Sequence, residues 1–280
     1  MRKIDLNNKV CVITGAGGVL CSEFAKAVGA CGAKVALLDL NEAAAKKVAD
    51  QINNDGGCAI AIACNVLERA SLVEAKKIIG EKFGKVDILI NGAGGNNPKG
   101  STAKDIYEAG DIDDESVKSF FDLDGDGIRF VFDLNFLGTL LPTQVFAEDM
   151  ARNEDGIILN VSSMNAFCPL TRIPAYSGAK AAISNFTQWL AVHFAQTGIR
   201  VNAIAPGFFL TEQNRALLTN EDGSYTARSH KILNATPMKR FGVPEDLLGT
   251  LLFLLDNEQS AFVTGVVVPV DGGFSAYSGV

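Results

Sequence analysis

The chain repeats short, continuous apolar runs that are separated by longer segments in which apolar residues recur at helical spacing. The first two runs, residues 9–14 (KVCVIT) and 34–39 (KVALLD), enclose such a helical segment. Apolar runs without alternation are typical of parallel strands that are buried on both faces. We therefore expect a strand, a helix and a second strand in this order.

The same order continues along the chain. Further strands are expected at residues 59–63, 86–90, 157–161, 200–205 and 266–270, and further helices at 41–53, 70–83, 129–153, 175–197 and 244–255. Alternating strands and helices build a parallel sheet with helices on both faces. The expected fold class is therefore α/β, with residues 1–280 forming a single-domain, Rossmann-type, doubly wound parallel sheet of about seven strands flanked by helices.

Two segments depart from this alternation. Residues 95–128 are polar and glycine-rich, and we expect them to form a long loop. Residues 208–242 form a second long polar segment, and because loops of this length often cover active sites, we interpret it as a substrate lid. A solvated surface would account for most of its charges equally well.

The first of these segments contains an acidic stretch, residues 122–127 (DLDGDG), that begins like a calcium-binding loop of the EF-hand type. The twelfth position of such a loop is glutamate, whereas this chain has Asp133 there. We therefore favour an acidic turn followed by a helix that Asp126 caps, and we assign no metal.

Composition narrows the class of ligand. The formal net charge is -7 and the pI is about 5.0, which argues against a nucleic-acid partner. The N-terminal residues do not resemble a secretory signal, and the longest apolar runs are far shorter than a membrane span. We expect a cytoplasmic protein that binds small molecules and has no membrane partner. Its six cysteines form no CxxC pair and are expected to be reduced.

A glycine-rich turn follows the first strand, with Gly15, Gly17 and Gly18 between this strand and the next helical segment. Free backbone N–H groups and the helix dipole together favour a phosphate at the start of a helix. Asp39 ends the second strand, where an acid accepts hydrogen bonds from a ribose diol and repels a 2′-phosphate. The pattern predicts a dinucleotide site that prefers NAD to NADP, although the glycines alone would also suit an ordinary turn.

Three side chains near the middle of the chain suggest carbonyl reduction. Tyr176 and Lys180 are four residues apart and share one face if residues 175–197 are helical. Because a neighbouring cation favours the phenolate, we expect Lys180 to lower the pKa of Tyr176 towards neutrality. Ser163 follows the strand at 157–161 and is placed to hold the substrate oxygen. A surface tyrosine beside a surface lysine is the alternative interpretation.

These features together resemble the short-chain dehydrogenase/reductase family. The resemblance rests on TGAGGVLC (14–21), NGAG (91–94), Asn135, Ser163, Tyr176, Lys180 and PGFFLT (206–211), which follow the family's order and spacing. It covers essentially the whole chain and implies an NAD-dependent oxidoreductase of alcohol and keto groups. It also implies that Asn135 holds a water in a proton relay, that Lys180 binds the ribose, and that the protein is a homo-oligomer, either a tetramer or a dimer.

The resemblance implies a set of cofactor contacts. They are Gly15, Gly17, Gly18, Val19, Leu20, Asp39, Asn65, Val66, Asn91, Ala93, Gly94, Tyr176, Lys180, Pro206, Gly207, Phe209 and Thr211. Asn65 stands where the family usually has aspartate, and its amide oxygen can accept a hydrogen bond from adenine. By the same resemblance, Asn91 braces the sheet, and the backbone at Phe209 and the Thr211 hydroxyl hold the nicotinamide carboxamide.

The glycine turn departs from the family pattern, because Val19 and Cys21 stand where the family has its second and third glycines. A β-branched residue does not readily adopt a positive φ, and a cysteine side chain would push helix and strand apart. We therefore expect a remodelled turn in which Gly17 and Gly18 approach the pyrophosphate.

Stretches such as INGAGGNNP and TPMKRFG resemble family members that act on sugar acids. Arginine is suited to holding a carboxylate. Besides Ser163 and Tyr176, the candidate substrate residues are Asn96, Asn97, Arg172, Arg215 and Arg228. The alternatives are another polyol or sugar-acid dehydrogenase of the gluconate 5-dehydrogenase type, a 3-oxoacyl reductase, and a non-catalytic dinucleotide sensor.

Overall fold

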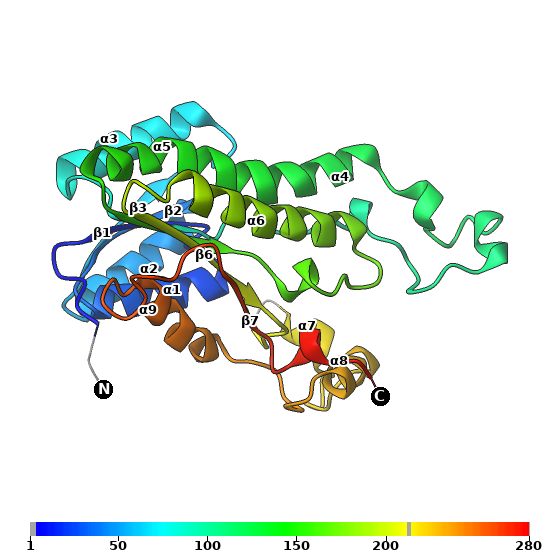
Figure 1. Ribbon diagram of the computed structural model, residues 1–280. Helices are drawn as coiled ribbons and strands as arrows, with labels where there is room; N and C mark the ends of the chain where they lie inside the picture. The colour runs from blue at the N-terminus through cyan, green and yellow to red at the C-terminus, as the bar shows by residue number, and fades with distance from the viewer. Residues whose placement is uncertain (1–3, 212–213, 280) are drawn as a thin grey trace.

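The computed structural model describes residues 4–211 and 214–279; residues 1–3, residues 212–213 of the predicted lid, and residue 280 lie outside the described residues. A seven-stranded parallel sheet has the order β3-β2-β1-β4-β5-β6-β7. Helices cover both faces of this sheet (Figure 1). The predicted α/β fold class, with its doubly wound parallel sheet, is confirmed.

The strands coincide with the continuous apolar runs of the sequence. They are β1 (Val10–Thr14), β2 (Lys34–Asp39), β3 (Cys58–Ala63), β4 (Ile88–Asn91), β5 (Gly156–Val161), β6 (Ile199–Pro206) and β7 (Val267–Val270). The helices are α1 (Val19–Ala30), α2 (Glu42–Asn54), α3 (Arg69–Lys82), α4 (Gly125–Phe132), α5 (Gly138–Asn153), α6 (Pro174–His193), α7 (Arg215–Leu218), α8 (Ala227–Ala235) and α9 (Leu248–Leu255).

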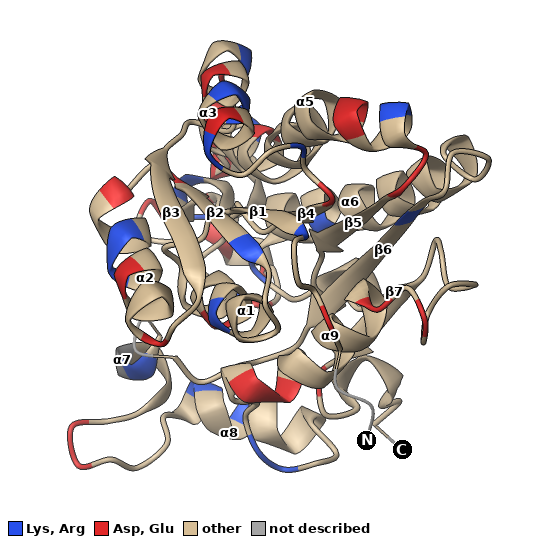
Figure 2. Ribbon diagram, turned by 90° about the vertical axis from the view of Figure 1, so that its left-hand side faces the viewer, with Lys and Arg blue, Asp and Glu red and all other residues tan. Residues whose placement is uncertain are grey.

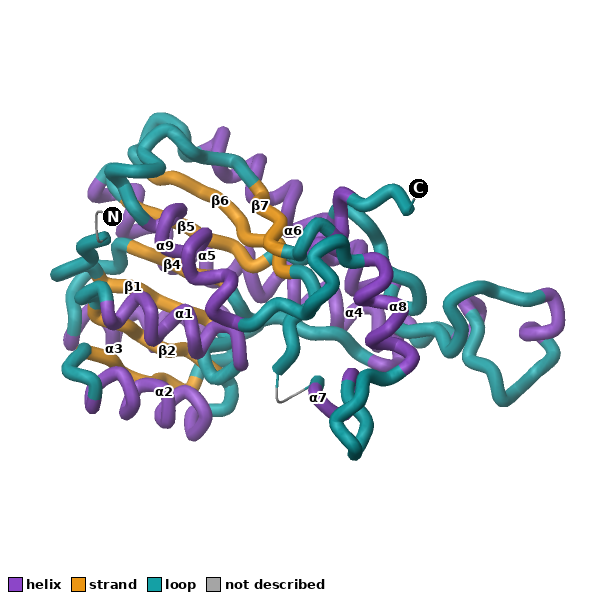
Figure 3. The backbone as a smooth tube through the Cα atoms, turned by 90° about the horizontal axis from the view of Figure 1, so that it is seen from below, coloured by secondary structure: helices purple, strands orange, loops and turns teal. Residues whose placement is uncertain are grey.

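Two apolar layers hold this arrangement together. Helices α1, α2 and α9 cover one face of the sheet, and α3, α5 and α6 cover the other (Figures 1 and 3). Phe24 and Leu251 belong to the first apolar cluster, and Phe146 and Leu190 to the second. Because both faces of the central strands are buried, those strands are mostly apolar, with Thr14, Asn91 and Asn160 as buried polar residues towards their carboxyl ends.

The order of the strands creates the functional edge. The chain runs outward from β1 to β3 and then returns to β4, which pairs with the other side of β1. The connections after β1 and β4 therefore leave in opposite directions. Ligands of such sheets bind in the crevice that opens at this point, beyond the carboxyl ends of the strands.

Residues 125–153 form one continuous helical rod, in which α4 and α5 are joined by a π-helical turn (Asp133–Leu137). By length and composition alone, this rod could cross a membrane, which the lengths of the apolar runs did not indicate. Half of its most apolar window is buried inside the fold, and Phe146 and Met150 are fully buried. The apolar character of the rod is thus accounted for by packing against the sheet.

Two details predicted from the sequence are wrong. Asp124, rather than Asp126, caps the helix, because its carboxylate accepts a hydrogen bond from the backbone N–H of Gly127 at 2.6 Å. Asp126 lies in the first helical turn and pairs with Arg129 on the surface. The helix that begins beside Tyr176 ends at His193 and does not extend to residue 197. Within the described ranges, no three His, Cys, Asp or Glu side chains are close enough to hold a metal ion.

Residues 95–124 project from the body as an arm of short turns (Figure 3), and the predicted loop at 95–128 was too long because α4 already begins at Gly125. Phe120 and Phe121, which belong to this arm, are each 66% exposed. Elsewhere Figure 2 shows Lys and Arg interspersed with Asp and Glu along the helices, as in the Lys46–Asp50 ion pair of α2. None of the six cysteines, all of which lie in the described part of the chain, forms a disulfide; Cys11, Cys21 and Cys64 are buried and Cys58 is exposed.

Candidate active site

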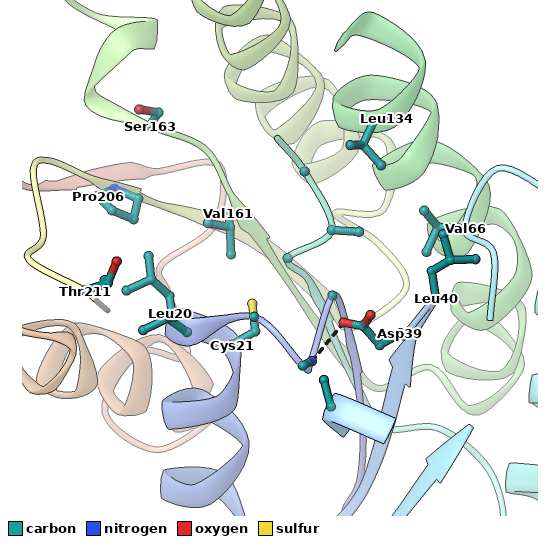
Figure 4. A pocket seen from close by; sticks show the side chains of 18 of the residues that line it. Leu20, Cys21, Asp39, Leu40, Val66, Leu134, Val161, Ser163, Pro206 and Thr211 are labelled. Carbon is teal, nitrogen blue, oxygen red and sulfur yellow. Dashed lines mark hydrogen bonds between the residues drawn. The ribbon is translucent and has the colours of Figure 1, made fainter. Parts of the chain in front are cut away.

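A cleft of about 680 Å³ lies beyond the carboxyl ends of the strands, where the order of the sheet reverses. Turns that follow β1 to β6 form its walls. Figure 4 shows Asp39, Leu40 and Val66 at one end of the cleft and Ser163 and Thr211 at the other. The cleft is therefore elongated across the sheet edge, from the predicted adenosine end to the predicted reaction centre.

The N–H groups of the glycine turn form hydrogen bonds within the protein. Gly15 has a φ of +64°, which favours glycine, and a Cβ there would lie 2.8 Å from the Ala93 Cα. The Gly17 N–H donates to the Asp39 carboxylate at 2.8 Å (dashed in Figure 4), and the Gly18 N–H donates to the Gly15 carbonyl at 3.0 Å. Gly17 and Gly18 both line the cleft, so the close approach of a pyrophosphate to them stays a prediction, although their N–H groups have partners within the protein.

The first turn of α1 offers free N–H groups at the helix start, where the sequence pattern predicted a phosphate. Helix α1 begins at Val19, has no side-chain cap, and has no acidic residue in its first turn. The first N–H groups of a helix have no partner within it, and the dipole places positive charge there. Val19, Leu20 and Cys21 all line the cleft. This turn is suited to a pyrophosphate, and Val19 needs no positive φ because it is already helical.

The Cys21 side chain packs against Gly92 in the loop after β4. A Cβ added to Gly92 would lie 2.1 Å from the Cys21 Sγ and 2.9 Å from the Thr14 carbonyl oxygen. The sulfur therefore fills the space that a side chain at position 92 would need. Burial raises the pKa of the Cys21 thiol to about 12, so the thiol is uncharged at neutral pH. A small residue in the loop after β4 thus compensates for a larger one in α1.

Asp39 is held rigidly at the end of β2. Besides accepting from Gly17, its carboxylate accepts from the Asn41 N–H at 2.8 Å. Two backbone donors leave the other lone pairs of the carboxylate for a ligand diol. Asn65 lies on the same side of the cleft, and its amide oxygen accepts from the Leu67 N–H at 3.1 Å.

Tyr176, Ser163 and Lys180 meet at the other end of the cleft. The Lys180 Nζ donates to the Val161 carbonyl at 2.9 Å and lies 5.6 Å from the centre of the Tyr176 ring. Burial raises the pKa of Tyr176 to about 12, and a hydrogen bond with Ser163 lowers it in part. Burial also lowers the pKa of Lys180 to about 8.

The expectation that Lys180 makes Tyr176 acidic is therefore not met by the structure. Desolvation of the phenol outweighs any effect of the ammonium on it. A phenol with a raised pKa keeps its proton at neutral pH. It is suited to giving a proton to a carbonyl oxygen, which is the step that reduction requires.

Asn135 lies in the π-helical turn and is fully buried. Its amide nitrogen donates to the carbonyls of Gly95 and Val131, each at 2.7 Å. A Cβ added to Gly94 would lie 2.7 Å from the Asn135 Oδ1 and 3.2 Å from the Lys180 Nζ. Asn135 and Lys180 thus converge on Gly94, the position at which the turn after β4 has no side chain.

Asn91 connects the elements beneath the cleft. Its amide nitrogen donates to Asn160 of β5 at 2.9 Å and to Thr143 of α5 at 3.0 Å. Asn160 in turn donates to Thr187 of α6 at 2.9 Å. These buried bonds fix β4, β5 and the two helices that carry Asn135 and Lys180 relative to one another.

The five further candidates for substrate binding do not line the cleft. Asn96 donates to the Ser101 hydroxyl, and Asn97 caps a short turn by accepting from the Lys99 N–H. Arg215 begins α7, and Arg228 is exposed on α8. Their positions in the sequence did not show whether these side chains point towards the cleft, because that depends on how the arm and the lid fold.

The Arg172 side chain binds the arm instead of lining the cleft. Its Nε donates to the Thr102 carbonyl at 3.1 Å. Next to it, the Asp105 carboxylate accepts from the Thr171 hydroxyl at 3.2 Å and from the Lys231 Nζ of α8 at 3.1 Å. The arm, the segment between Ser163 and Tyr176, and the predicted lid therefore meet at Asp105.

Sequence reasoning missed several residues of the cleft. They include Cys21, Leu40, Leu134, Ser162, Phe208 and Asn214. The sequence did carry a signal for Leu40, because it directly follows Asp39, the acid that ends β2; the structure leaves its side chain 78% exposed. The sequence carried no such signal for Asn214, because its approach to the cleft depends on the turn that follows β6.

The chain is similar to proteins of one family. The family model described as short chain dehydrogenase matches residues 9–222. An uncharacterised oxidoreductase of Haemophilus influenzae is 61% identical over 276 residues, which are 99% of this chain and 96% of that protein. The 7alpha-hydroxysteroid dehydrogenase of Escherichia coli is 32% identical over 270 residues, which are 96% of this chain and 95% of that protein.

A solved structure with bound NAD is similar over nearly the whole fold. It is that of a candidate D-mannonate oxidoreductase from Haemophilus influenza, with a TM-score of 0.94 and 60% sequence identity. The match covers 99% of this chain and 98% of that chain.

Proposed function

We propose that this chain, which belongs to the short-chain dehydrogenase family and is an oxidoreductase of alcohol and keto groups, transfers hydride between NADH and a keto sugar acid. The substrate pair proposed is D-fructuronate and D-mannonate. The observation that carries the reaction class is the meeting of Ser163, Tyr176 and Lys180 at one end of a dinucleotide-sized cleft. The motifs INGAGGNNP and TPMKRFG and the similarity to a candidate D-mannonate oxidoreductase support the proposed substrate.

Asp39 supports NAD over NADP. Its carboxylate is fixed by Gly17 and Asn41 at the end of β2, where a ribose would lie. A 2′-phosphate there would meet a like charge that cannot turn away. The first turn of α1 would hold the pyrophosphate through its N–H groups.

The proposed reduction uses the protonated phenol. When bound, NADH supplies the hydride for the keto carbon. The hydroxyls of Ser163 and Tyr176 would hold the keto oxygen, and Tyr176 would give it a proton as the alkoxide forms. Lys180 would place a positive charge beside the phenolate that remains. Asn135, packed against the same glycine, would link this site to a proton relay.

The pH dependence of the reaction should reflect the protonation state of the Lys180 amine. Its pKa is about 8, so the amine is cationic at lower pH and neutral at higher pH. We expect kcat/KM for keto-acid reduction to fall as the pH rises through about 8, because the charge that stabilises the phenolate is lost. Tyr176 keeps its proton throughout this range. A pH profile of kcat/KM would test this, with Lys180→Met expected to be slower at every pH and to lack the decline.

Turnover with a panel of substrates and both cofactors tests the assignment. We expect D-fructuronate with NADH to react faster than 5-ketogluconate or an acetoacetyl thioester, and NADPH to be at least about tenfold less effective because of Asp39. Faster reduction of the thioester would favour a 3-oxoacyl reductase. NADH binding without turnover of any keto acid would favour a dinucleotide sensor.

A further inference from the structure

The turn after β6 is fixed from two sides. On the outer side, the Leu210 N–H donates to the Gly242 carbonyl at 3.0 Å, and the Gly242 N–H donates to the Phe208 carbonyl at 2.9 Å. On the inner side, the Asn214 amide oxygen accepts from the Thr211 N–H at 2.8 Å, and its amide nitrogen donates to the Phe209 carbonyl at 2.7 Å. One side chain thus satisfies both ends of residues 209–211.

The Asn214 side chain bonds to this turn instead of capping the N-terminus of its own helix, α7. It occupies the position before α7, where asparagine normally accepts hydrogen bonds from the first N–H groups of the helix. Its side chain makes no such cap bond. The residue also lines the cleft, together with Phe209 and Thr211. The geometry therefore commits the amide to the turn after β6 rather than to its own helix.

We infer that Asn214 is a positioning residue for the nicotinamide end of the cofactor, acting through residues 209–211. This inference rests on the proposed function, in which Phe209 and Thr211 hold the carboxamide. Without the amide, the Thr211 N–H and the Phe209 carbonyl would lose their partners, and the turn could rotate these groups away from the cleft. The adenosine and pyrophosphate contacts at Asp39 and α1 would be unaffected, because they belong to the other end of the cleft.

Binding of NADH and of ADP-ribose, which lacks nicotinamide, tests the inference without requiring turnover. For Asn214→Ala we expect NADH to bind about tenfold more weakly, as the loss of two hydrogen bonds implies, and ADP-ribose to bind as it does to the natural chain. The fluorescence change of NADH on binding, which senses the nicotinamide environment, should shrink in the variant. Asn214→Asp keeps an acceptor for the Thr211 N–H but sets a carboxylate oxygen, which cannot donate, against the Phe209 carbonyl, so it should weaken NADH binding at least as much as Asn214→Ala.

Asn220→Ala is the matched control, because the Asn220 amide bonds stay within its own surface turn at Ser224 and Tyr225. It should bind both ligands normally. Equal weakening of NADH and ADP-ribose by Asn214→Ala, or no weakening of either, would overturn the inference while leaving the proposed function standing. If the natural chain bound neither ligand, the proposed function would fail and the inference with it.

Discussion

Replacing Tyr176 with phenylalanine should slow keto-acid reduction by about 10²–10⁴-fold, which is the usual contribution of a general acid. The reason is that the hydroxyl removed is the proton donor whose pKa burial holds near 12. NADH binding should be unchanged, because the aromatic ring remains in place. Single-turnover oxidation of NADH and direct NADH titration would separate the two effects.

Tyr107→Phe is the matched control for this variant. Tyr107 lies on the arm and packs edge-on against Phe121, a contact that phenylalanine preserves. Its turnover should equal that of the natural chain. Retention of more than about a tenth of the natural rate by Tyr176→Phe would contradict its role as the acid, since another group or water would then be supplying the proton.

Replacing Gly92 with alanine should destabilise the protein. The added Cβ would lie 2.1 Å from the Cys21 Sγ, so the sulfur or the turn must move. Overpacking of a close-packed interior lowers the free energy of unfolding by about 1–3 kcal/mol. Urea denaturation would detect this change as a lower midpoint.

A double-mutant cycle assigns the loss to the pair. Cys21→Ala removes the sulfur and leaves a Cβ at 3.6 Å from the new methyl, so Gly92→Ala should be less destabilising in that background. A residual loss is expected, because the Thr14 carbonyl would still be 2.9 Å away. Gly80→Ala on α3, where a Cβ meets nothing within 4 Å, should leave the midpoint unchanged or raise it slightly. Equal losses from Gly92→Ala in both backgrounds would refute the pairing.

The sheet could be predicted from the sequence because its strands are buried on both faces. Burial of both faces requires apolar residues at successive positions, and such runs are visible without any knowledge of the fold. The same holds for Asp39 and for the spacing of Tyr176 and Lys180, since each depends on one strand or one helix. Boundaries were less certain where a helix ends on the surface, as at His193.

The arm and the lid were not predictable in this way. Their polar residues follow no period, and their positions depend on contacts between distant segments, such as Asp105 with Lys231. Arg172 was a reasonable substrate candidate because it lies between Ser163 and Tyr176 in the sequence, yet its Nε donates to the Thr102 carbonyl of the arm.

The sequence by itself determined the order of strands and helices and the presence of a phenol, an ammonium and an acid at the edge of the sheet. Tertiary structure decided the protonation of Tyr176, because desolvation depends on every segment that packs around a group. It also decided that Cys21 fits against Gly92 and that Asn214 serves the turn after β6. These contacts join residues that no local periodicity relates, so their outcome follows from close packing in three dimensions.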